Sequence, residues 1–239
     1  MGKGPGIYSD IGKKARDLLY KDYQSGLKLS IATHSINGSM LETITGDEAA
    51  PCLMMISYRI PDIRSTVKLG VQCLHDYAGF NTSVGLTADP IANFSGVIGN
   101  SVAALGTDVS IDTKTGNFLK YNAGLSLTDA DLIASLAVNE KANQLKTSYY
   151  HLLSPLTNSA VGAELTHNFS TKENTITVGT QHSLGPLTTI KAGADNAGKI
   201  HALIQHEWHP KCGFTISGEV DTKAVDKTVK IGLAVALKL

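Results

Sequence analysis

An alternation of apolar and polar residues runs through the chain from Ser65 to Leu239, in runs of about ten residues that end in Gly, Asn, Asp, Pro or Lys. The last run places apolar residues on one parity: Val229, Ile231, Leu233, Val235 and Leu237. Because successive side chains of a strand point to opposite faces, each run has one apolar and one polar face. About ten residues is also the length with which a tilted strand crosses a bilayer. The pattern predicts a membrane β-barrel, and periodicity alone leaves a soluble all-β protein as the alternative.

Turn residues, such as those at 115–117, divide the chain into sixteen predicted strands. The strands are centred near residues 31, 42, 55, 71, 83, 95, 107, 121, 134, 148, 164, 178, 190, 203, 216 and 233. Aromatic residues fall near the predicted strand ends: Tyr58, Tyr77, Phe80, Phe94, Phe118, Trp208 and Phe214. A membrane barrel places its interfacial aromatic girdles there, so their position favours the membrane barrel over the soluble protein.

Composition excludes several other classes of protein. No apolar stretch comes near the roughly 18 residues that a transmembrane helix needs. Lys plus Arg equals Asp plus Glu at 21 each, so no basic excess indicates a nucleic-acid partner. The opening residues lack the apolar core of a secretory signal, and three widely spaced cysteines argue for a reducing compartment and against a disulfide framework. Together these features predict a membrane that is reached from the cytosol.

Residues 1–25 differ from the rest of the chain and form the first of two predicted segments, an amphipathic helix with its linker, ahead of the barrel at 26–239. Apolar residues recur at helical spacing: Ile7, Ile11, Ala15 and Leu18. Charged residues fill the other faces of this helix, among them Asp10, Lys13, Lys14, Arg16 and Asp17. On a soluble protein such a cluster is an ordinary solvated helix face.

Catalytic and metal-binding motifs do not emerge from the sequence. His206, Glu207 and His209 have the spacing His-Glu-x-His, whereas a zinc helix has His-Glu-x-x-His, and their segment is predicted as a strand. The glycine-rich stretch 96–106 lacks the Lys-Ser/Thr pair of a phosphate-binding loop. We therefore predict no enzyme activity, no metal site and no cofactor.

Six segments closely resemble plant mitochondrial porins, the voltage-dependent anion channel family. They are GPGIYSDIGKKARDLLYKDY, HDYAGFNTSVGLTADPIANFSGV, ALGTDVSIDTKTGNF, SYYHLLSPLTNSAVGAELTH, TITVGTQH and FTISGEVDTKAVDK. The resemblance covers almost the whole chain and implies a closed, antiparallel transmembrane β-barrel, here of about sixteen strands, with the amino-terminal helix in the lumen. It further implies an anion-selective channel of the mitochondrial outer membrane.

The resemblance also implies partners and site residues. The partners are small anions and metabolites including nucleotides, the lipid bilayer, the outer-membrane import and barrel-assembly machinery, and other copies of the chain, but no nucleic acid. The expected pore residues are Lys13, Lys14, Arg16, Asp10, Asp17 and Lys230. The expected carboxy-terminal insertion signal consists of Lys230, Gly232, Val235 and Leu237.

The chain departs from the family in length. Between Ser35 and Met40 about 35 residues of the family pattern are missing, the equivalent of about three strands, so sixteen remain of the usual nineteen. Gly185, Gly193 and His201 also differ from the family pattern. A degenerate, poorly conducting barrel that acts as a membrane docking platform is therefore the alternative function.

The even number of strands and the alternation of the last strand lead to two further predictions about the barrel. The first strand, near Leu27 to His34, pairs antiparallel with the last strand, near Val229 to Leu237. Lys230 and Lys238 then point into the lumen, because they have the parity opposite to the apolar residues of the last strand.

Overall fold

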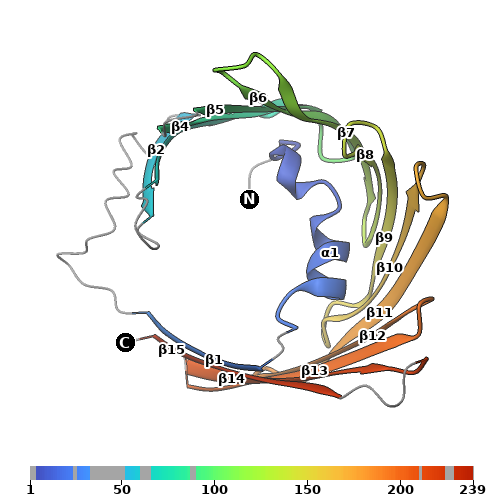
Figure 1. Ribbon diagram of the computed structural model, residues 1–239. Coiled ribbons are helices and arrows are strands. Elements are labelled where there is room, and N and C mark those ends of the chain that lie inside the picture. Colours follow the sequence, from blue (N-terminus) through green and yellow to red (C-terminus); the bar gives the residue numbers. More distant parts are fainter. Residues whose placement is uncertain are drawn as a thin grey trace. The chain divides into compact units, whose positions relative to one another are not determined.

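The computed structural model describes residues 4–23, 26–32, 52–59, 66–86, 90–209, 212–223 and 229–238 (Figure 1). Over these ranges the chain forms one 3-10 helix, one α-helix and fifteen strands. In order they are η1 (Tyr8–Asp10), α1 (Lys13–Tyr20), β1 (Gly26–Ala32), β2 (Cys52–Arg59), β3 (Thr66–Leu74), β4 (Ala78–Leu86), β5 (Ile91–Gly99), β6 (Ala103–Asp112), β7 (Phe118–Asp129), β8 (Leu132–Asn139), β9 (Gln144–Ser154), β10 (Ser159–Asn168), β11 (Glu173–Gly185), β12 (Thr188–Asp195), β13 (Lys199–His209), β14 (Cys212–Asp221) and β15 (Lys230–Lys238).

The strands confirm the pattern that the sequence predicts. Fifteen of the sixteen predicted strand centres fall inside a strand, from the centre near residue 31 in β1 to the one near residue 233 in β15. The remaining centre, near residue 42, lies outside the described residues. Period-two alternation is a local property of the chain, so it survives whichever strands become neighbours.

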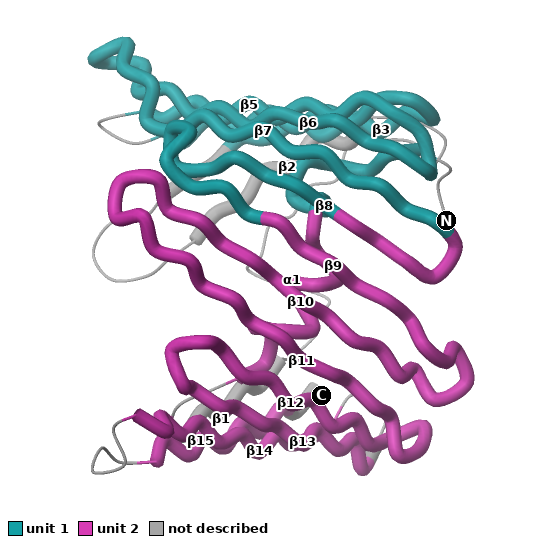
Figure 2. Tube along the Cα trace, turned by 90° about the vertical axis from the view of Figure 1, so that its right-hand side faces the viewer, with its two compact units in different colours: residues 1–11, 37–129, 135–146 teal, residues 12–36, 130–134, 147–239 magenta. Residues whose placement is uncertain are grey.

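The chain divides into two compact units, coloured separately in Figure 2. Unit 1 consists of Met1–Ile11, Asn37–Asp129 and Ser135–Lys146, and unit 2 consists of Gly12–Ile36, Ala130–Ala134 and Thr147–Leu239. Strands β8 and β9 contribute residues to both units. The predicted division into residues 1–25 and 26–239 stays a prediction.

In unit 1, consecutive strands from β2 to β7 pair antiparallel. The register shifts between Ser110 and Ile111, where β6 meets β7. In unit 2, β10 to β15 likewise pair antiparallel in sequence order. The runs β2–β7 and β10–β15 are thus meanders of hairpins, in which consecutive strands lie side by side.

The first and last strands pair with each other, but parallel. β1 lies beside β15 with Leu27 opposite Leu233 and Ile31 opposite Leu237. The prediction of an antiparallel pair is therefore wrong. Alternation reads the same in both directions along a strand, so it fixes the faces of β1 and β15 but not their relative direction.

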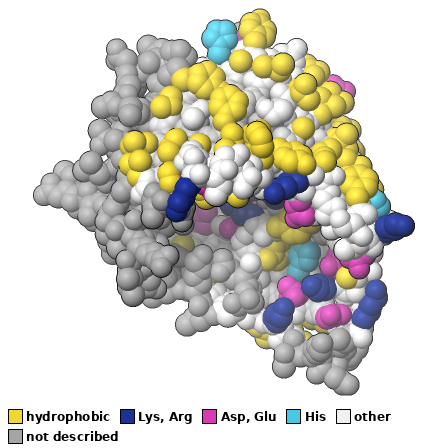
Figure 3. All heavy atoms as spheres, turned by 45° about the horizontal axis from the view of Figure 1, so that its top comes forward, with side chains coloured by type: hydrophobic (Ala, Val, Ile, Leu, Met, Phe, Trp, Pro, Cys, Tyr) yellow, Lys and Arg dark blue, Asp and Glu magenta, His cyan; other side chains and the backbone are white. Residues whose placement is uncertain are grey.

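The two faces of the strands differ in polarity as predicted. In β13, Ile200, Ile204 and Trp208 are exposed on one face, whereas His201 and Gln205 belong to the other. Figure 3 shows hydrophobic side chains gathered over much of the surface that it displays, with charged side chains gathered elsewhere. Large exposed apolar side chains in such numbers suit a lipid environment and not water.

The amino-terminal segment forms two short helices instead of the single amphipathic helix predicted within residues 1–25. Gly12 has φ 66°, in the left-handed region, and lies between η1 and α1. Glycine adopts this conformation without the steric cost that a Cβ brings, so the helical spacing continues in the sequence while the helix itself is interrupted.

Helix α1 packs on the sheet of unit 2 through its apolar side (Figure 1). Leu18 and Leu19 are buried with Ala160 of β10, and Tyr150 and Leu152 of β9 pack against them. Gly179 of β11 allows this approach, because a Cβ there would lie 2.8 Å from Cδ2 of Leu19. We call the side of β10–β15 on which α1 lies the helix-bearing face.

Candidate functional site

The cations predicted to face a pore lie on the exposed side of α1. Lys13, Lys14 and Arg16 are exposed, whereas Ala15 is buried against the sheet. Nζ of Lys14 lies 5.6 Å from the ring centroid of Tyr150 in β9. A cation–π contact of this kind contributes about 0.5–1 kcal/mol at an exposed site. Within unit 2 the structure therefore brings the cations together on one side of the helix.

The two predicted acidic residues have different local roles. Asp10, in η1, accepts a hydrogen bond from the Ile7 N–H through Oδ2 at 3.1 Å. Its carboxylate thus supports the start of η1, in unit 1. Asp17 is half-buried in α1, and its backbone carbonyl accepts a hydrogen bond from Nζ of Lys191 in β12 at 3.1 Å.

The carboxy-terminal end of α1 makes polar contacts with three strands. The Tyr20 hydroxyl donates to Oε1 of Glu164 in β10 at 2.8 Å, and its oxygen lies 3.3 Å from Oγ1 of Thr177 in β11. Glu164 and Thr177 are both buried. Burial raises the pKa of Tyr20 to about 12, so its hydroxyl keeps its proton and remains a donor at neutral pH. Lys191 supplies the third contact, from β12.

A cavity of about 280 Å³ lies beside this end of the helix. Its lining includes Tyr20, Tyr23, Asp195, Lys199, His201 and Glu219. The Tyr23 and His201 rings meet edge to face with centroids 4.4 Å apart. Burial raises the pKa of Tyr23 to about 12. The cavity is lined by polar and apolar groups and by charges of both signs, and its residues all belong to unit 2.

Lys230 lies on the helix-bearing face, as the parity argument predicts. Its Nζ donates to Oε1 of Glu219 in β14 at 3.1 Å, and Glu219 lines the cavity beside α1. Both side chains are partly exposed, at 59% and 42%, so the pair contributes at most about 1 kcal/mol. The side chain of Lys238 lies outside the described residues.

The predicted insertion signal lies in β15. Gly232 is buried, whereas Ile231 and Leu233 on either side of it are exposed on the opposite face. Val235 is half-buried and pairs with Phe214 of β14, and Leu237 pairs with Cys212. These residues thus lie in a strand, and their role in insertion stays a prediction.

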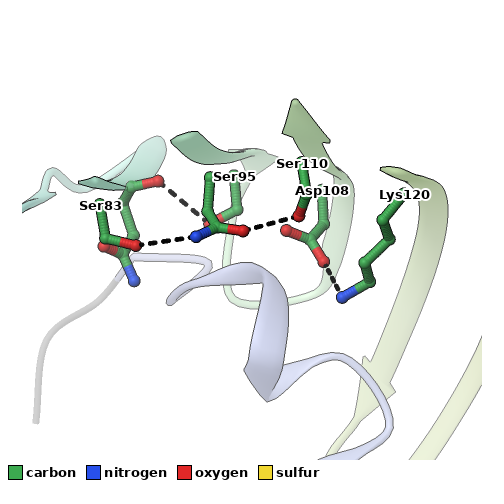
Figure 4. Close-up of polar contacts among 7 residues, drawn as sticks. Ser83, Ser95, Asp108, Ser110 and Lys120 are labelled. Atoms are coloured by element: carbon green, nitrogen blue, oxygen red, sulfur yellow. Dashed lines mark hydrogen bonds and ion pairs between the residues drawn. The ribbon is translucent and has the colours of Figure 1, made fainter. Parts of the chain in front are cut away.

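A second set of polar contacts, which the sequence did not single out, lies on β4–β7 of unit 1 (Figure 4). Nζ of Lys120 in β7 lies 2.5 Å from Oδ2 of Asp108 in β6. Beside this pair, the Ser110 hydroxyl donates to Oδ1 of Asn93 at 2.7 Å, and Nδ2 of Asn93 donates to Ser83 at 3.4 Å. Alternation along each strand shows that these residues share its polar face, but it does not show which of them contact one another.

The His-Glu-x-His segment lies in a strand, as predicted. His206 and Glu207 are successive residues of β13 and so belong to opposite faces, and Nδ1 of His206 lies 2.9 Å from Oγ1 of Thr188. Among the described residues, no group of three His, Cys, Asp or Glu is arranged to hold a metal ion.

Cys212 is free but Cys73 is disulfide-bonded, so the expectation of reduced cysteines is wrong for Cys73. Distant residues of a sequence become neighbours when their strands pair, as Cys73 and Cys52 do in the β2–β3 register.

No helix in the described part of the chain is long and apolar enough to cross a membrane.

Comparison with known protein families gives one match that covers most of the chain. The family profile described as "Eukaryotic porin" matches residues 52–232. Two structures of low sequence identity resemble the fold. One, described as "Asymmetric conductivity of engineered proteins", has TM-score 0.53 and 10% identity over 78% of this chain and 89% of that chain. The other, a triple mutant of the Rhodopseudomonas blastica porin, has TM-score 0.50 and 9% identity over 77% of this chain and 88% of that chain. They show the fold, which is that of a porin β-barrel.

Curated relatives match over the full length of both chains. The 34 kDa mitochondrial outer membrane porin of Solanum tuberosum is 58% identical, and mitochondrial outer membrane protein porin 1 of Arabidopsis thaliana is 54% identical. The outer plastidial membrane porin of Pisum sativum is 48% identical. Each alignment spans 276 positions and covers all 239 residues of this chain, so at least 276 − 239 = 37 positions have no residue here. This difference agrees with the shortening predicted from the sequence.

Proposed function

Because this chain belongs to the eukaryotic porin family, we propose that it forms a voltage-dependent, anion-selective channel that passes small ions and metabolites across the mitochondrial outer membrane. The Solanum and Arabidopsis relatives are named mitochondrial outer membrane proteins, which supports that location over the plastid membrane in the name of the Pisum relative. Porins conduct through a barrel lumen, and the chemistry proposed here is passage and not catalysis.

The separation of apolar and polar side chains along single strands carries this proposal. In β11, Ile176, Val178 and Leu184 are exposed on one face, whereas Thr177 and Gln181 lie on the helix-bearing face. A soluble sheet buries its apolar face and exposes its polar face. The reverse arrangement, with the charged helix on the polar side, suits a wall that has lipid on one side and water on the other.

The cations of α1 are the proposed source of anion selectivity. Lys13, Lys14 and Arg16 lie on the exposed side of the helix. The Asp10 carboxylate accepts the Ile7 N–H, and Asp17 offers its backbone carbonyl to Lys191. A cluster of one sign beside a low-dielectric wall raises the local concentration of counter-ions. Lys230 is a weaker contributor in this proposal, because Glu219 pairs with it.

The remaining partners follow from the same function. Metabolite anions including nucleotides are the proposed cargo, and the import and barrel-assembly machinery is the proposed reader of Lys230, Gly232, Val235 and Leu237. Association with further copies of the chain is part of the proposal. A docking platform that barely conducts is not favoured, because the charged helix and the separated faces are those of a channel wall.

Planar bilayers test the channel function directly. Purified protein is refolded in detergent, added to one side of a bilayer, and recorded first in symmetric salt and then in a salt gradient. We expect stepwise conductance, closure at higher voltage of either sign, and a reversal potential on the anion side. Protein that inserts, as judged by protease protection in vesicles, but gives no conductance steps would support the docking platform instead.

A further inference from the structure

Lys191 is a charged residue that the channel function by itself does not explain. It lies on the helix-bearing face of β12, and only 8% of its side chain is exposed. An ammonium group taken out of water is costly unless its protons find acceptors. Its ammonium has one hydrogen-bond acceptor and one ion-pair partner, and these belong to α1 and to the turn that follows it.

The hydrogen-bond acceptor is the backbone carbonyl of Asp17, 3.1 Å from Nζ of Lys191. Asp17 is among the last four residues of α1, whose carbonyls have no donor within the helix. This end of a helix also carries partial negative charge, which a cation stabilises. The last turn of α1 contains no basic residue, and Lys21 is its C-cap; Lys191 adds a cation from the sheet that also donates to a carbonyl of this turn.

The second group is the carboxylate of Asp22, whose Oδ2 lies 3.8 Å from Nζ of Lys191, within the distance of an ion pair. Asp22 has φ 73°, a backbone conformation that is uncommon for a residue with a side chain. The turn at 21–22 thus has a conformation that costs free energy, and it brings the carboxylate within ion-pair distance of the buried ammonium.

We propose that Lys191 is a positioning residue, which fixes the carboxy-terminal half of α1 on the helix-bearing face through the Asp17 carbonyl and the Asp22 carboxylate. Lys191 thereby sets where Lys13, Lys14 and Arg16 stand above the sheet of unit 2. The effect on ion selectivity rests on the proposed channel function, but the attachment of the helix does not.

Hydrogen–deuterium exchange of the α1 amides tests the attachment in the full chain, refolded in lipid. We expect Lys191→Met to speed exchange over residues 13–23 by about tenfold or more, with the amides of β10–β12 still protected. Lys191→Arg, which keeps the cation, should restore most of the protection. Lys172→Met is the matched control, because it removes the same charge from an exposed side chain in the turn between β10 and β11, away from the helix. It should leave the exchange of α1 unchanged.

Asp22→Asn carries the test where Lys191→Met fails to fold, since the Asp22 side chain is 39% exposed and tolerates the change. It should also speed exchange of the α1 amides. Unchanged exchange in folded Lys191→Met, or in Asp22→Asn when Lys191→Met does not fold, would overturn the proposal.

Reversal potentials in a salt gradient separate positioning from a direct effect of charge on the permeating ions. Lys191→Met removes a positive charge, whereas Asp22→Asn removes a negative one. If Lys191 acts by holding the helix, both variants weaken anion selectivity, whereas direct electrostatics would shift the two reversal potentials in opposite directions and would contradict the inference. A wild-type protein with protected α1 amides but no conductance would refute the channel function and leave the attachment by Lys191 intact.

Discussion

At the scale of single residues, the close approach of Leu19 to Gly179 decides how α1 packs on the sheet. Leu19 is 1% exposed, and its Cδ2 atom occupies the space where a Cβ of residue 179 would lie. The same Cβ would also lie 3.0 Å from the backbone oxygen of Ala192, which cannot move without disturbing β12. Gly179 is therefore a position where the absence of a side chain determines the packing of another element.

Gly179→Val tests this packing. The added side chain forces Leu19 outward, and overpacking of this kind costs about 1–3 kcal/mol of stability. We expect a lower urea midpoint for the detergent-refolded protein. The matched control is Gly185→Val in the same strand, since a Cβ at Gly185 meets nothing within 4 Å. Equal midpoints for the two variants would show that the space beside Leu19 is not limiting.

At the scale of elements, α1 and β15 are both amphipathic, but their apolar sides meet different surroundings. The apolar side of α1 is buried against β9 and β10. In β15, Ile231 and Leu233 are exposed on the face away from the helix. The same amphipathic character therefore serves packing in the helix and contact with lipid in the strand.

Charge reversal on α1 tests whether the helix lines the conducting path. Replacing Lys13, Lys14 and Arg16 with Glu should move the reversal potential in a salt gradient toward cations, and more so at low ionic strength, where screening is weaker. The control is the same triple reversal at three exposed turn lysines, Lys114, Lys141 and Lys172. If both triple variants keep the wild-type reversal potential with conductance intact, the helix does not face the permeating ions.

A double substitution in β15 tests the face assigned to lipid. Val235→Asp with Leu237→Asp places two carboxylates on the predicted lipid side, where a charge near the midplane costs up to about 2–4 kcal/mol, somewhat less for acids. We expect loss of carbonate-resistant protein in isolated mitochondria. The matched variant, Ala234→Asp with Ala236→Asp, puts the same charges on the opposite parity and should integrate better. Equal integration of the two variants would refute the face assignment.

At the scale of the whole chain, the pairing of β1 with β15 joins residues from the two ends of the sequence. Backbone groups in lipid must find partners within the protein, because each unpaired group costs several kcal/mol. Parallel pairing of Gly26–Ala32 with β15 supplies such partners to both strands. The two strands that lie farthest apart in the sequence thus protect each other's edges.

Cysteine cross-linking distinguishes the parallel from the antiparallel pair. In the parallel register Leu27 lies opposite Leu233, whereas an antiparallel pair centred on the same residues would place Leu27 opposite Leu237. With the free Cys212 replaced by Ser, we expect Leu27→Cys to cross-link with Leu233→Cys on mild oxidation and not with Leu237→Cys. Mobility on non-reducing gels reads the result, and efficient cross-linking of the second pair alone would restore the antiparallel assignment.

The sequence by itself determined the strands, their two faces and the family. Alternation such as that from Val229 to Leu237 is a local pattern, and steric rules assign its two parities to opposite faces in any strand. Alternation placed Lys230 on the polar face, and helical spacing placed the cations of residues 13–16 away from the apolar side of a helix.

Only the tertiary structure decided which distant groups meet. Lys191 and Asp17 are 174 positions apart, so no local pattern shows that the lysine serves the end of the helix. The direction of β1 beside β15, the pairing of Asp108 with Lys120 and the break at Gly12 depend likewise on neighbours or on a backbone conformation that alternation does not encode. Periodicity fixes where a side chain points relative to its own strand, whereas partners are fixed by which strands and helices come to lie side by side.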